Sequence, residues 1–393
     1  MVERDFWQKR IEEAWKQRSV IWLSGVRRVG KTCLAKSLRN VEYFDCELPR
    51  VRQQLQDPEA FLKDLRDSRI VLDEIHRLAN PSEILKIAAD HYPEARVLAT
   101  GSSTLGASSK FRDTLTGRKS EIWLTPMVAA DLEAFGNSNL RHRFHGGGMP
   151  EIFLAKERPE RIFQEWMDAY WAKDIQELFR LERRHSFQQL AELLFVQSGS
   201  IFEATRFSRA CEVSRPTVTN YLSVLEATYV VHVVRPFSSR RATEIISAPK
   251  VYGFDTGFVC YYRGWESLRS EDLGVLWEHY VLNELHGRLQ TRSIHYWRDK
   301  RGHEVDFVLP LRRHAPVAVE CKWSCKDFDP AGVKAFSRRY PDGLFLVVAR
   351  DVDRPHSSSF GGITVRFVDL DSLIRQVLEL SGSSLPGTVR RRS

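Results

Sequence analysis

Short apolar runs alternate with segments of helical periodicity through the first third of the chain. The runs that predict buried strands are 20–23, 41–44, 70–72, 96–99 and 121–124. The segments with helical periodicity between them are 31–39, 58–67 and 82–91. Strands that alternate with helices in this way are typical of a parallel sheet covered by helices. The pattern therefore predicts an α/β domain.

The pattern changes after this domain. Residues 126–185 are predominantly helical in pattern, with a break at 145–150, where three glycines followed by Met-Pro cannot continue a helix. From about 186 to 246, short helical segments precede a β-rich stretch. From about 250 a third region begins, and its expected strands are 305–309, 317–321 and 342–348.

Residues 25–32 fit the pattern G-x-x-x-x-G-K-[ST] at every fixed position, between a predicted strand and a predicted helix. The backbone N–H groups of such a loop converge on a β-phosphate. Lys31 would neutralise the β- and γ-phosphates, and the Thr32 hydroxyl would bind Mg²⁺. A chance glycine-rich turn is the alternative. The residues expected to hold ATP are Gly25, Val26, Arg27, Arg28, Val29, Gly30, Lys31 and Thr32.

A second acidic motif argues against chance, because the apolar strand at 69–72 ends in Asp73 and Glu74. Asp73 is expected to hold the water shell of Mg²⁺, and Glu74 to polarise the attacking water, which predicts hydrolysis and not binding alone. The next strand ends in Thr100-Gly101-Ser102-Ser103, where a hydroxyl could reach the γ-phosphate; a surface turn is the alternative. Arg118 could serve the ATP of a neighbouring subunit, or be a solvated side chain.

Residues 202–211 and 215–222 predict two helices joined by a short turn, with Ser214 as a favoured N-cap. Val218, Leu222 and Leu225 recur at helical spacing and should be buried. A β-like run at 229–234 follows, and Ser239-Arg240-Arg241 could form the tip of a wing. This resembles a winged helix that binds DNA; a helical module for protein contacts is the alternative. The expected DNA-contact residues are Arg215, Thr217, Thr219 and Asn220.

Two predicted strands near the end of the chain, 303–309 and 317–322, carry carboxylates. Side chains on a strand alternate between faces, so Glu320 and Lys322 share a face, and Asp306 can meet Glu320 if the strands pair. Glu278, on a predicted helix, could add a third carboxylate. Such a set could hold a divalent cation and cut DNA. The alternatives are an amphipathic hairpin, or a nuclease-like core that binds or docks without cutting.

The series GVRRVGKT, VLDEIHR, LATGSS, LTGR and GGGMP resembles the bacterial and archaeal AAA-type ATPases that carry a DUF4143 C-terminal region, over nearly the whole chain. The resemblance implies a sensor role for Ser102 and an arginine-finger role for Arg118. The D…E-x-K pattern at Asp306, Glu320 and Lys322 resembles the PD-(D/E)xK nucleases. The chain departs from the family at His76, where glutamine is common, and at 126–130, where a more leucine-rich segment is usual.

These inferences together predict an α/β fold in which an AAA-type P-loop sheet is followed by several modules. The expected segments are a P-loop ATPase core at 1–125, a helical lid at 126–185, a winged helix-turn-helix module at 186–249, a restriction-endonuclease-like α/β domain at 250–380 and a disordered tail at 381–393. ATP binding and hydrolysis should move the lid, and the later modules should follow.

Composition adds little to this picture. The net charge of +8, from 59 basic and 51 acidic residues, favours a polyanionic partner but is not concentrated in one run. No apolar stretch is long enough for a membrane span, residues 1–18 do not resemble a signal peptide, and the six cysteines lack metal-site spacing. We therefore expect a cytoplasmic homo-oligomeric ATPase that uses ATP and Mg²⁺ and acts on DNA. The alternative is a nucleotide-gated scaffold that docks a protein partner.

Overall fold

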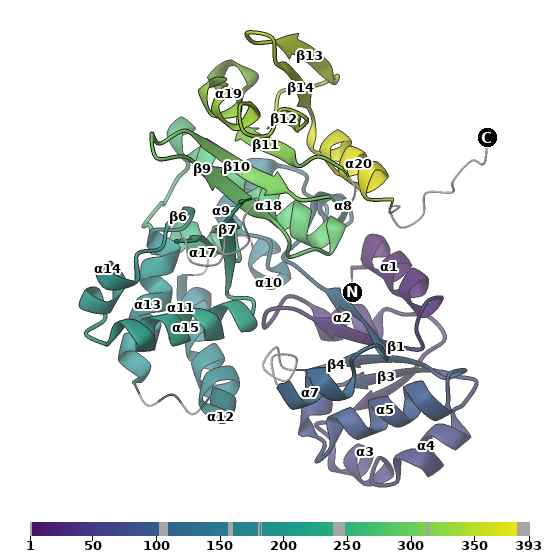
Figure 1. Cartoon of the computed structure of the whole chain (residues 1–393). Helices are drawn as coiled ribbons and strands as arrows, with labels where there is room; N and C mark the ends of the chain where they lie inside the picture. Colours follow the sequence, from purple (N-terminus) through teal and green to yellow (C-terminus); the bar gives the residue numbers. More distant parts are fainter. Residues whose placement is uncertain are drawn as a thin grey trace, which may run out of the picture. The chain divides into compact units, whose positions relative to one another are not determined.

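The computed structural model describes residues 2–101, 109–155, 160–179, 181, 183–238, 248–311 and 314–382. The chain divides into two compact units. Unit 1 comprises 1–138, 148–184 and 223–230, and unit 2 comprises 139–147, 185–222 and 231–393. Within the described ranges, no helix combines the length and the apolar character that a membrane span needs. Figure 1 shows the elements of both units.

Unit 1 is built on a five-stranded sheet in the order β2-β3-β4-β1-β5, and every pair of neighbouring strands is parallel. The strands are β1 (Val20–Ser24), β2 (Glu42–Asp45), β3 (Arg69–Asp73), β4 (Arg96–Thr100) and β5 (Lys119–Trp123). All five residues of β1 are buried, as expected for a strand with helices on both faces. The predicted parallel α/β sheet is confirmed.

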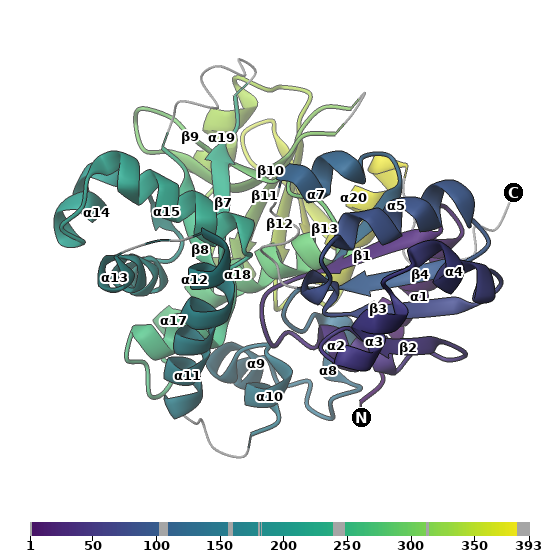
Figure 2. The same ribbon diagram turned by 90° about the horizontal axis from the view of Figure 1, so that it is seen from below.

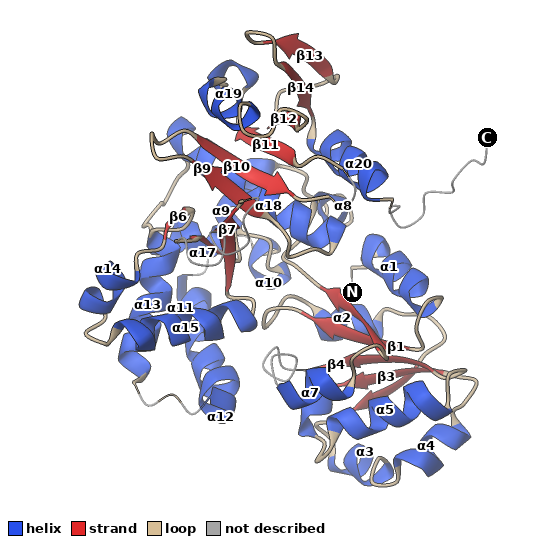
Figure 3. Ribbon diagram, viewed as in Figure 1, coloured by secondary structure: helices blue, strands red, loops and turns tan. Residues whose placement is uncertain are grey.

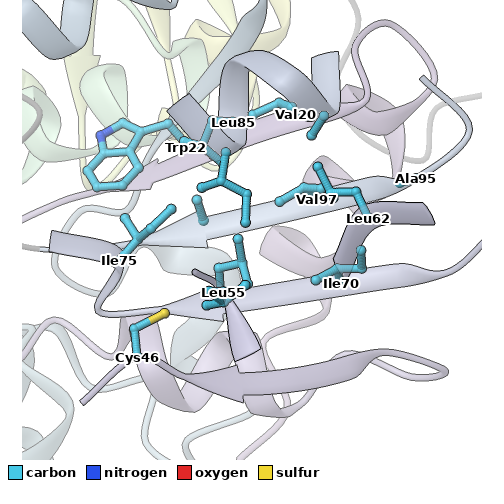
Figure 4. Packing of buried hydrophobic residues seen from close by; sticks show 14 of the residues in the cluster. Val20, Trp22, Cys46, Leu55, Leu62, Ile70, Ile75, Leu85, Ala95 and Val97 are labelled. Carbon is cyan, nitrogen blue, oxygen red and sulfur yellow. The ribbon is translucent and has the colours of Figure 1, made fainter. Parts of the chain in front are cut away.

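Helices cover this sheet, and Figure 2 shows the strands of unit 1 lying among them. The elements of the first part of unit 1 are α1 (Asp5–Trp15), α2 (Lys31–Lys36), α3 (Pro49–Gln54), α4 (Pro58–Asp64), η1 (Ile75–Arg77), α5 (Pro81–His91) and α7 (Ser109–Thr114). Later elements are α8 (Ala129–Leu132), α10 (Pro150–Phe153), α11 (Glu160–Tyr170), the π-helical turn η2 (Trp171–Ile175) and α12 (Gln176–Phe179). Trp22, Leu85 and Val97 lie in the core between sheet and helices (Figure 4).

The strand order decides which side chains can meet. Strand β4 lies between β1 and β3 and is parallel to both. The carboxyl ends of all three strands therefore share one edge of the sheet. Leu23 is paired with Thr100, and Leu72 is paired with Ala99. The P-loop that follows Ser24 therefore lies at the same edge as Asp73. In open α/β sheets, ligands bind beyond this edge.

Unit 2 is built on a mixed nine-stranded sheet in the order β13-β14-β12-β11-β10-β9-β7-β8-β6, coloured red in Figure 3. The strands are β6 (Ser200–Ile201), β7 (Val231–Pro236), β8 (Lys250–Gly253), β9 (His295–Arg298), β10 (Glu304–Leu309), β11 (Val317–Lys322), β12 (Leu344–Ala349), β13 (His356–Ser359) and β14 (Thr364–Val368). The strands that follow the helix-turn-helix segment thus share one sheet with the C-terminal strands.

The helices of unit 2 include a long one, α18, whose residues are buried almost all round its axis in its second half. It contacts β11, α9, α17 and α20. The helices are α9 (Leu140–Gly146), α13 (Arg184–Val196), α14 (Ala204–Ala210), α15 (Arg215–Ala227), α17 (Thr256–Tyr262), α18 (Ser270–Leu289), the short η3 (Cys325–Asp327), α19 (Ala331–Ser337) and α20 (Leu370–Ser381). The first residue of α13 and the last five of α15 are assigned to unit 1.

The predicted break in the helical segment is confirmed. Helix α9 ends at Gly146 and α10 begins at Pro150. Gly147 has a φ of 83°, and a Cβ atom there would lie 2.0 Å from Asp255 Oδ1. Only glycine fits this position, because both the backbone conformation and the space exclude a side chain.

A buried ion pair connects the N-terminal helix to the P-loop within unit 1. Arg4 Nε and Nη2 donate to the two carboxylate oxygens of Asp131, at 2.9 and 2.6 Å, and Arg4 Nη1 donates to Val29 O at 3.2 Å. Trp7 Nε1 donates to the same carboxylate at 3.2 Å. Arg4 is 4% exposed and Asp131 is 1% exposed. A bidentate pair with further hydrogen bonds is the arrangement in which burying two charges is tolerated.

We predict that Arg4→Ala lowers the free energy of unfolding by about 3–5 kcal/mol, because the carboxylate of Asp131 would remain buried without its cation. Arg39→Ala is the matched control, since the side chain of Arg39 is 82% exposed in its ion pair with Glu3. It should change stability by less than about 1 kcal/mol. Chemical denaturation followed by circular dichroism measures both. Equal effects of the two substitutions would contradict the structural role of Arg4.

Candidate functional site

The loop between β1 and α2 turns through three left-handed residues, Gly25, Arg28 and Gly30, with φ of 142°, 61° and 102°. A Cβ atom at residue 25 would lie 2.3 Å from Leu124 O, so a side chain cannot be accommodated there. The backbone conformation therefore explains why the two fixed positions of the motif are glycines, because L-residues with side chains rarely adopt positive φ. The loop folds into a compact turn in front of Lys31.

The ammonium group of Lys31 lies across this turn. Its Nζ donates to Gly25 O at 2.8 Å and to Val26 O at 3.2 Å. Burial lowers the pKa of Lys31, and the negative charges of Glu74 and Asp174 act in the opposite direction. The ammonium is held by backbone carbonyls that it can exchange for phosphate oxygens.

A pocket of about 490 Å³ opens in front of the loop, and all of its lining residues belong to unit 1. They come from the loop and α2, from the ends of β3 and β4, and from the helical segment after residue 148. The residues are Arg27, Arg28, Gly30, Lys31, Thr32, Cys33, Glu47, Glu74, His76, Arg77, Gly101, Pro150, Glu151, Leu154, Lys173 and Asp174. The structure thus brings Lys31, Thr32 and Glu74, all predicted from the sequence, to one pocket.

Asp73 is buried at the end of β3 and is held by two hydroxyl groups. Tyr43 donates to its Oδ2 at 2.6 Å, and Thr100 donates to its Oδ1. Thr100 Oγ1 also accepts from the backbone N–H of Glu74 at 3.2 Å. Burial, and then the hydrogen bond to Asp73, raise the pKa of Tyr43, which stays a donor. These contacts fix the orientation of the Asp73 carboxylate and join β3 to β4.

Glu74 follows in a left-handed conformation with a φ of 55°. Its Oε2 lies 3.0 Å from His76 Nδ1. Burial raises the pKa of Glu74, but the hydrogen bond and charge of His76, together with Lys31 and Arg27, outweigh this effect, so the pKa is lowered overall. Glu74 is therefore a carboxylate at neutral pH, which is the form that accepts a proton.

The sequence did not reveal the contacts between the P-loop and the helical segment. Asp174, 3% exposed, pairs with Arg27 through a 3.3 Å contact to Nη1, and Trp166 Nε1 donates to Arg27 O at 3.1 Å. Asp174 lies in the π-helical turn η2. Such turns are rare in proteins overall, and those that occur are often found at functional sites. The segment Trp171–Ile175 carries no sequence signal for a π-turn, so this role of Asp174 could not be predicted.

Two further predicted residues differ in outcome. Ser102, the expected sensor, lies outside the described residues. Arg118 precedes β5 and lies at the amino edge of the sheet, because Lys119 is paired with Val20. The guanidinium of Arg118 donates to Asp90 at 2.8 Å, and this hydrogen bond raises the pKa of Arg118. Arg118 is thus at the edge opposite its own P-loop.

The carboxylates predicted for the C-terminal region lie together in unit 2. Strands β10 and β11 pair in antiparallel fashion, with Phe307 opposite Val319, and continuing this register places Asp306 opposite Glu320. Burial, and then the charge of Asp306, raise the pKa of Glu320 well above its ordinary value. The same two causes raise the pKa of Glu278 to about 7. The expected juxtaposition of the two strands is confirmed.

Lysine ammonium groups or hydrogen-bond donors contact the carboxylates of Glu278, Asp306 and Glu320. Lys322 Nζ lies 3.3 Å from Glu320 Oε2, and Lys250 Nζ lies 3.6 Å from Glu278 Oε1 and also pairs with Glu304. Asp306 Oδ2 accepts from the backbone N–H of Cys321 at 2.8 Å. Across the described part of the chain, no three His, Cys, Asp or Glu side chains are arranged to hold a metal ion. Lys250 and Lys322 thus lie among Glu278, Asp306 and Glu320, and the metal site expected at these three carboxylates stays a prediction.

The predicted helix-turn-helix segment forms α14 and α15, with a turn that ends in Ser214. The Ser214 hydroxyl accepts from Thr217 N at 3.3 Å, as an N-cap does. Val218, Leu222 and Leu225 are buried as expected. Among the four predicted DNA contacts, Arg215, Thr219 and Asn220 are exposed and Thr217 is half-buried. Residues 239–241, the expected wing tip, lie outside the described residues.

Three family models match the chain in succession. An "AAA domain" matches residues 17–132, a "Domain of unknown function (DUF8612)" matches 137–269, and a "Domain of unknown function (DUF4143)" matches 273–365. The chain thus carries an N-terminal AAA P-loop domain, a DUF8612 region in the middle and a C-terminal DUF4143 region. The resemblance inferred from the sequence motifs is confirmed.

The chain is also similar to individual proteins. It is 26% identical over 334 residues to the "Uncharacterized protein Rv2008c" of Mycobacterium tuberculosis, covering 82% of this chain and 74% of that protein. The Walker-type ATPase of Pyrococcus abyssi matches with 15% identity and a TM-score of 0.43, over 67% of this chain and 96% of that one. AMPPCP-bound DnaA from Aquifex aeolicus matches with 15% identity and a TM-score of 0.29, over 56% and 86%. No functional conclusion follows from TM-scores this low.

The raised pKa of Glu278 predicts a pH dependence of stability. Its folded-state pKa of about 7 lies above the ordinary value of 4.5, so this contribution to stability is complete below about pH 4.5 and is lost as the pH rises through about 7. We expect Glu278→Gln to reduce the fall in stability between pH 5.5 and pH 8. Urea denaturation at several pH values measures it. Glu271→Gln, on the exposed first turn of the same helix, is the control, and an identical slope in both variants would contradict the prediction.

Proposed function

We propose that the chain binds ATP with Mg²⁺ at the loop 25–32 and hydrolyses it to ADP and phosphate. The observation that supports this most strongly is that Lys31 and Glu74, from different elements, line one pocket. A phosphate-binding lysine and a residue that orients or deprotonates the attacking water are two of the parts that recur in P-loop NTPases. The AAA domain match over 17–132 supports the same reaction.

Mg²⁺ would arrive as part of the substrate, and it neutralises charge on the β- and γ-phosphates. Thr32, which lines the pocket, and Asp73, at the adjacent strand end, are suitable oxygen ligands for it, directly or through water. The loop amides and Lys31 would bind the phosphates, and Lys31 would exchange its contacts with Gly25 and Val26 for phosphate oxygens.

In the hydrolysis step, the oxygen of a water molecule forms a bond to the γ-phosphorus while the bond from that phosphorus to the β–γ bridging oxygen breaks. The proton of the water passes to the Glu74 carboxylate, and ADP leaves with the bridging oxygen. Glu74 is suited to this role because its lowered pKa keeps it ionised.

Nucleotide binding should also change the contacts of the helical segment of unit 1. Arg27 pairs with Asp174, and Arg28 pairs with Glu151 at 3.6 Å. A triphosphate in the pocket offers both arginines competing negative charge. These ion pairs would then be weaker with a triphosphate bound than without it. The segment that carries Asp174 and Glu151 would move as a lid between the two states.

Arg118 is proposed as a finger for the ATP of a second copy. It lies at the sheet edge opposite its own P-loop, so it cannot serve its own nucleotide, whereas a neighbouring subunit could receive it. It would first have to exchange Asp90 for phosphate. This role requires a homo-oligomer.

DNA is the proposed partner of the helix-turn-helix segment. Arg215, Thr219 and Asn220 are exposed at the start of α15, and the net charge of +8 favours a polyanion. The second candidate function is a nucleotide-gated regulator that docks a protein and does not cut DNA. Mg²⁺-dependent cleavage at Asp306, Glu320 and Lys322 is a possible addition to the DNA role, since Lys322 lies 3.3 Å from Glu320 and Asp306 is in register with Glu320.

Two substitutions separate nucleotide binding from turnover. Lys31→Ala should weaken binding of a fluorescent ATP analogue by about 10- to 1,000-fold, because a buried charge-assisted contact is lost. Glu74→Gln should bind the analogue normally and lose at least about 100-fold in turnover, as expected for a general base. The controls are Lys36→Ala, an exposed lysine of the same helix, and Glu47→Gln, which lines the same pocket. Normal hydrolysis by Glu74→Gln would remove Glu74 from catalysis.

The DNA role predicts that duplex DNA stimulates ATP turnover and that its binding weakens steeply as salt rises. Arg215→Ala should weaken binding and reduce the salt slope by about 1, as for one lost phosphate contact. Arg375→Ala, an exposed arginine of α20, is the control. Fluorescence anisotropy between low and high salt measures both. Unchanged turnover with DNA, and no salt-dependent binding, would instead favour the regulator.

A further inference from the structure

His76 contacts the proposed general base directly. It lies in η1, one turn after β3, and its Nδ1 is 3.0 Å from Glu74 Oε2. The imidazole packs beside Gly101, where a Cβ atom would come within 3.5 Å of Nδ1 and 3.0 Å of Trp22. The side chain of His76 is 17% exposed and that of Glu74 is 32% exposed. The contact is therefore partly shielded from water, which strengthens it.

Two other cations that line this pocket, Arg77 and Lys31, have partners of their own. Arg77, the next residue, lies 3.6 Å from Glu47. Lys31 is held by the carbonyl groups of Gly25 and Val26. The charged groups that line the pocket with His76 are Arg27, Arg28, Lys31, Glu47, Glu74, Arg77, Glu151, Lys173 and Asp174.

We propose that His76 is a positioning residue for hydrolysis, which holds Oε2 of Glu74 so that Oε1 accepts the proton. The inference rests on the proposed ATPase function. The imidazole can hold the carboxylate through an N–H group.

The test compares wild-type protein with His76→Gln and His76→Ala, measuring kcat and KM for MgATP at pH 8. His76→Gln retains a side-chain N–H donor, so it should keep most of the wild-type kcat. His76→Ala should lower kcat at pH 8 by about 10- to 100-fold with little change in KM, because Glu74 is no longer held.

An unchanged kcat in His76→Ala, or a loss of kcat in His76→Gln as large as that in His76→Ala, would overturn the proposal. Thermal unfolding and binding of a fluorescent ADP analogue establish that the variants are folded and loaded. The proposed ATPase function is judged separately, from wild-type turnover at pH 8 and its loss in Glu74→Gln. If wild type hydrolyses ATP and Glu74→Gln does not, any failure concerns His76 alone.

Discussion

The close approach of the P-loop to β5 is the constraint on which the nucleotide site depends. At Gly25 the chain passes so near the carbonyl of Leu124 that no side chain fits, and the φ of 142° there begins the turn. This turn places the carbonyl groups of Gly25 and Val26 around the Lys31 ammonium. Without this turn, the Lys31 ammonium would point away from the pocket that Glu74, at the end of β3, also lines.

Both units bury charged side chains, and in each unit these side chains form ion pairs. In unit 1, Arg4 and Asp131 form a bidentate pair that also holds the P-loop carbonyl of Val29. In unit 2, Lys250 and Lys322 pair with carboxylates that would otherwise repel one another. An unpaired buried charge is far more costly than a paired one. Pairing therefore explains why lysines lie beside the clustered carboxylates of unit 2.

Much of unit 1 was predictable because its signals are local. Apolar runs and glycine spacing mark β1, β3 and the loop that contains Lys31, and two acidic residues mark the end of β3. The contacts that fix these residues were not predictable, since they join distant segments: Arg4 and Asp131 are 127 residues apart. Helix α18 gave only a weak signal, because a helix buried on all sides lacks an apolar stripe. His76 was visible as a departure from the family pattern, but its contact with Glu74 required the structure.

The nucleotide site depends on the binding of a triphosphate by the loop 25–32. Isothermal titration of the folded chain with ATP, in the presence and absence of Mg²⁺, measures this binding. We expect saturable heat for one nucleotide per chain. Absence of binding heat for both ATP and ADP at every magnesium concentration and at more than one temperature, with the protein folded throughout, would contradict it.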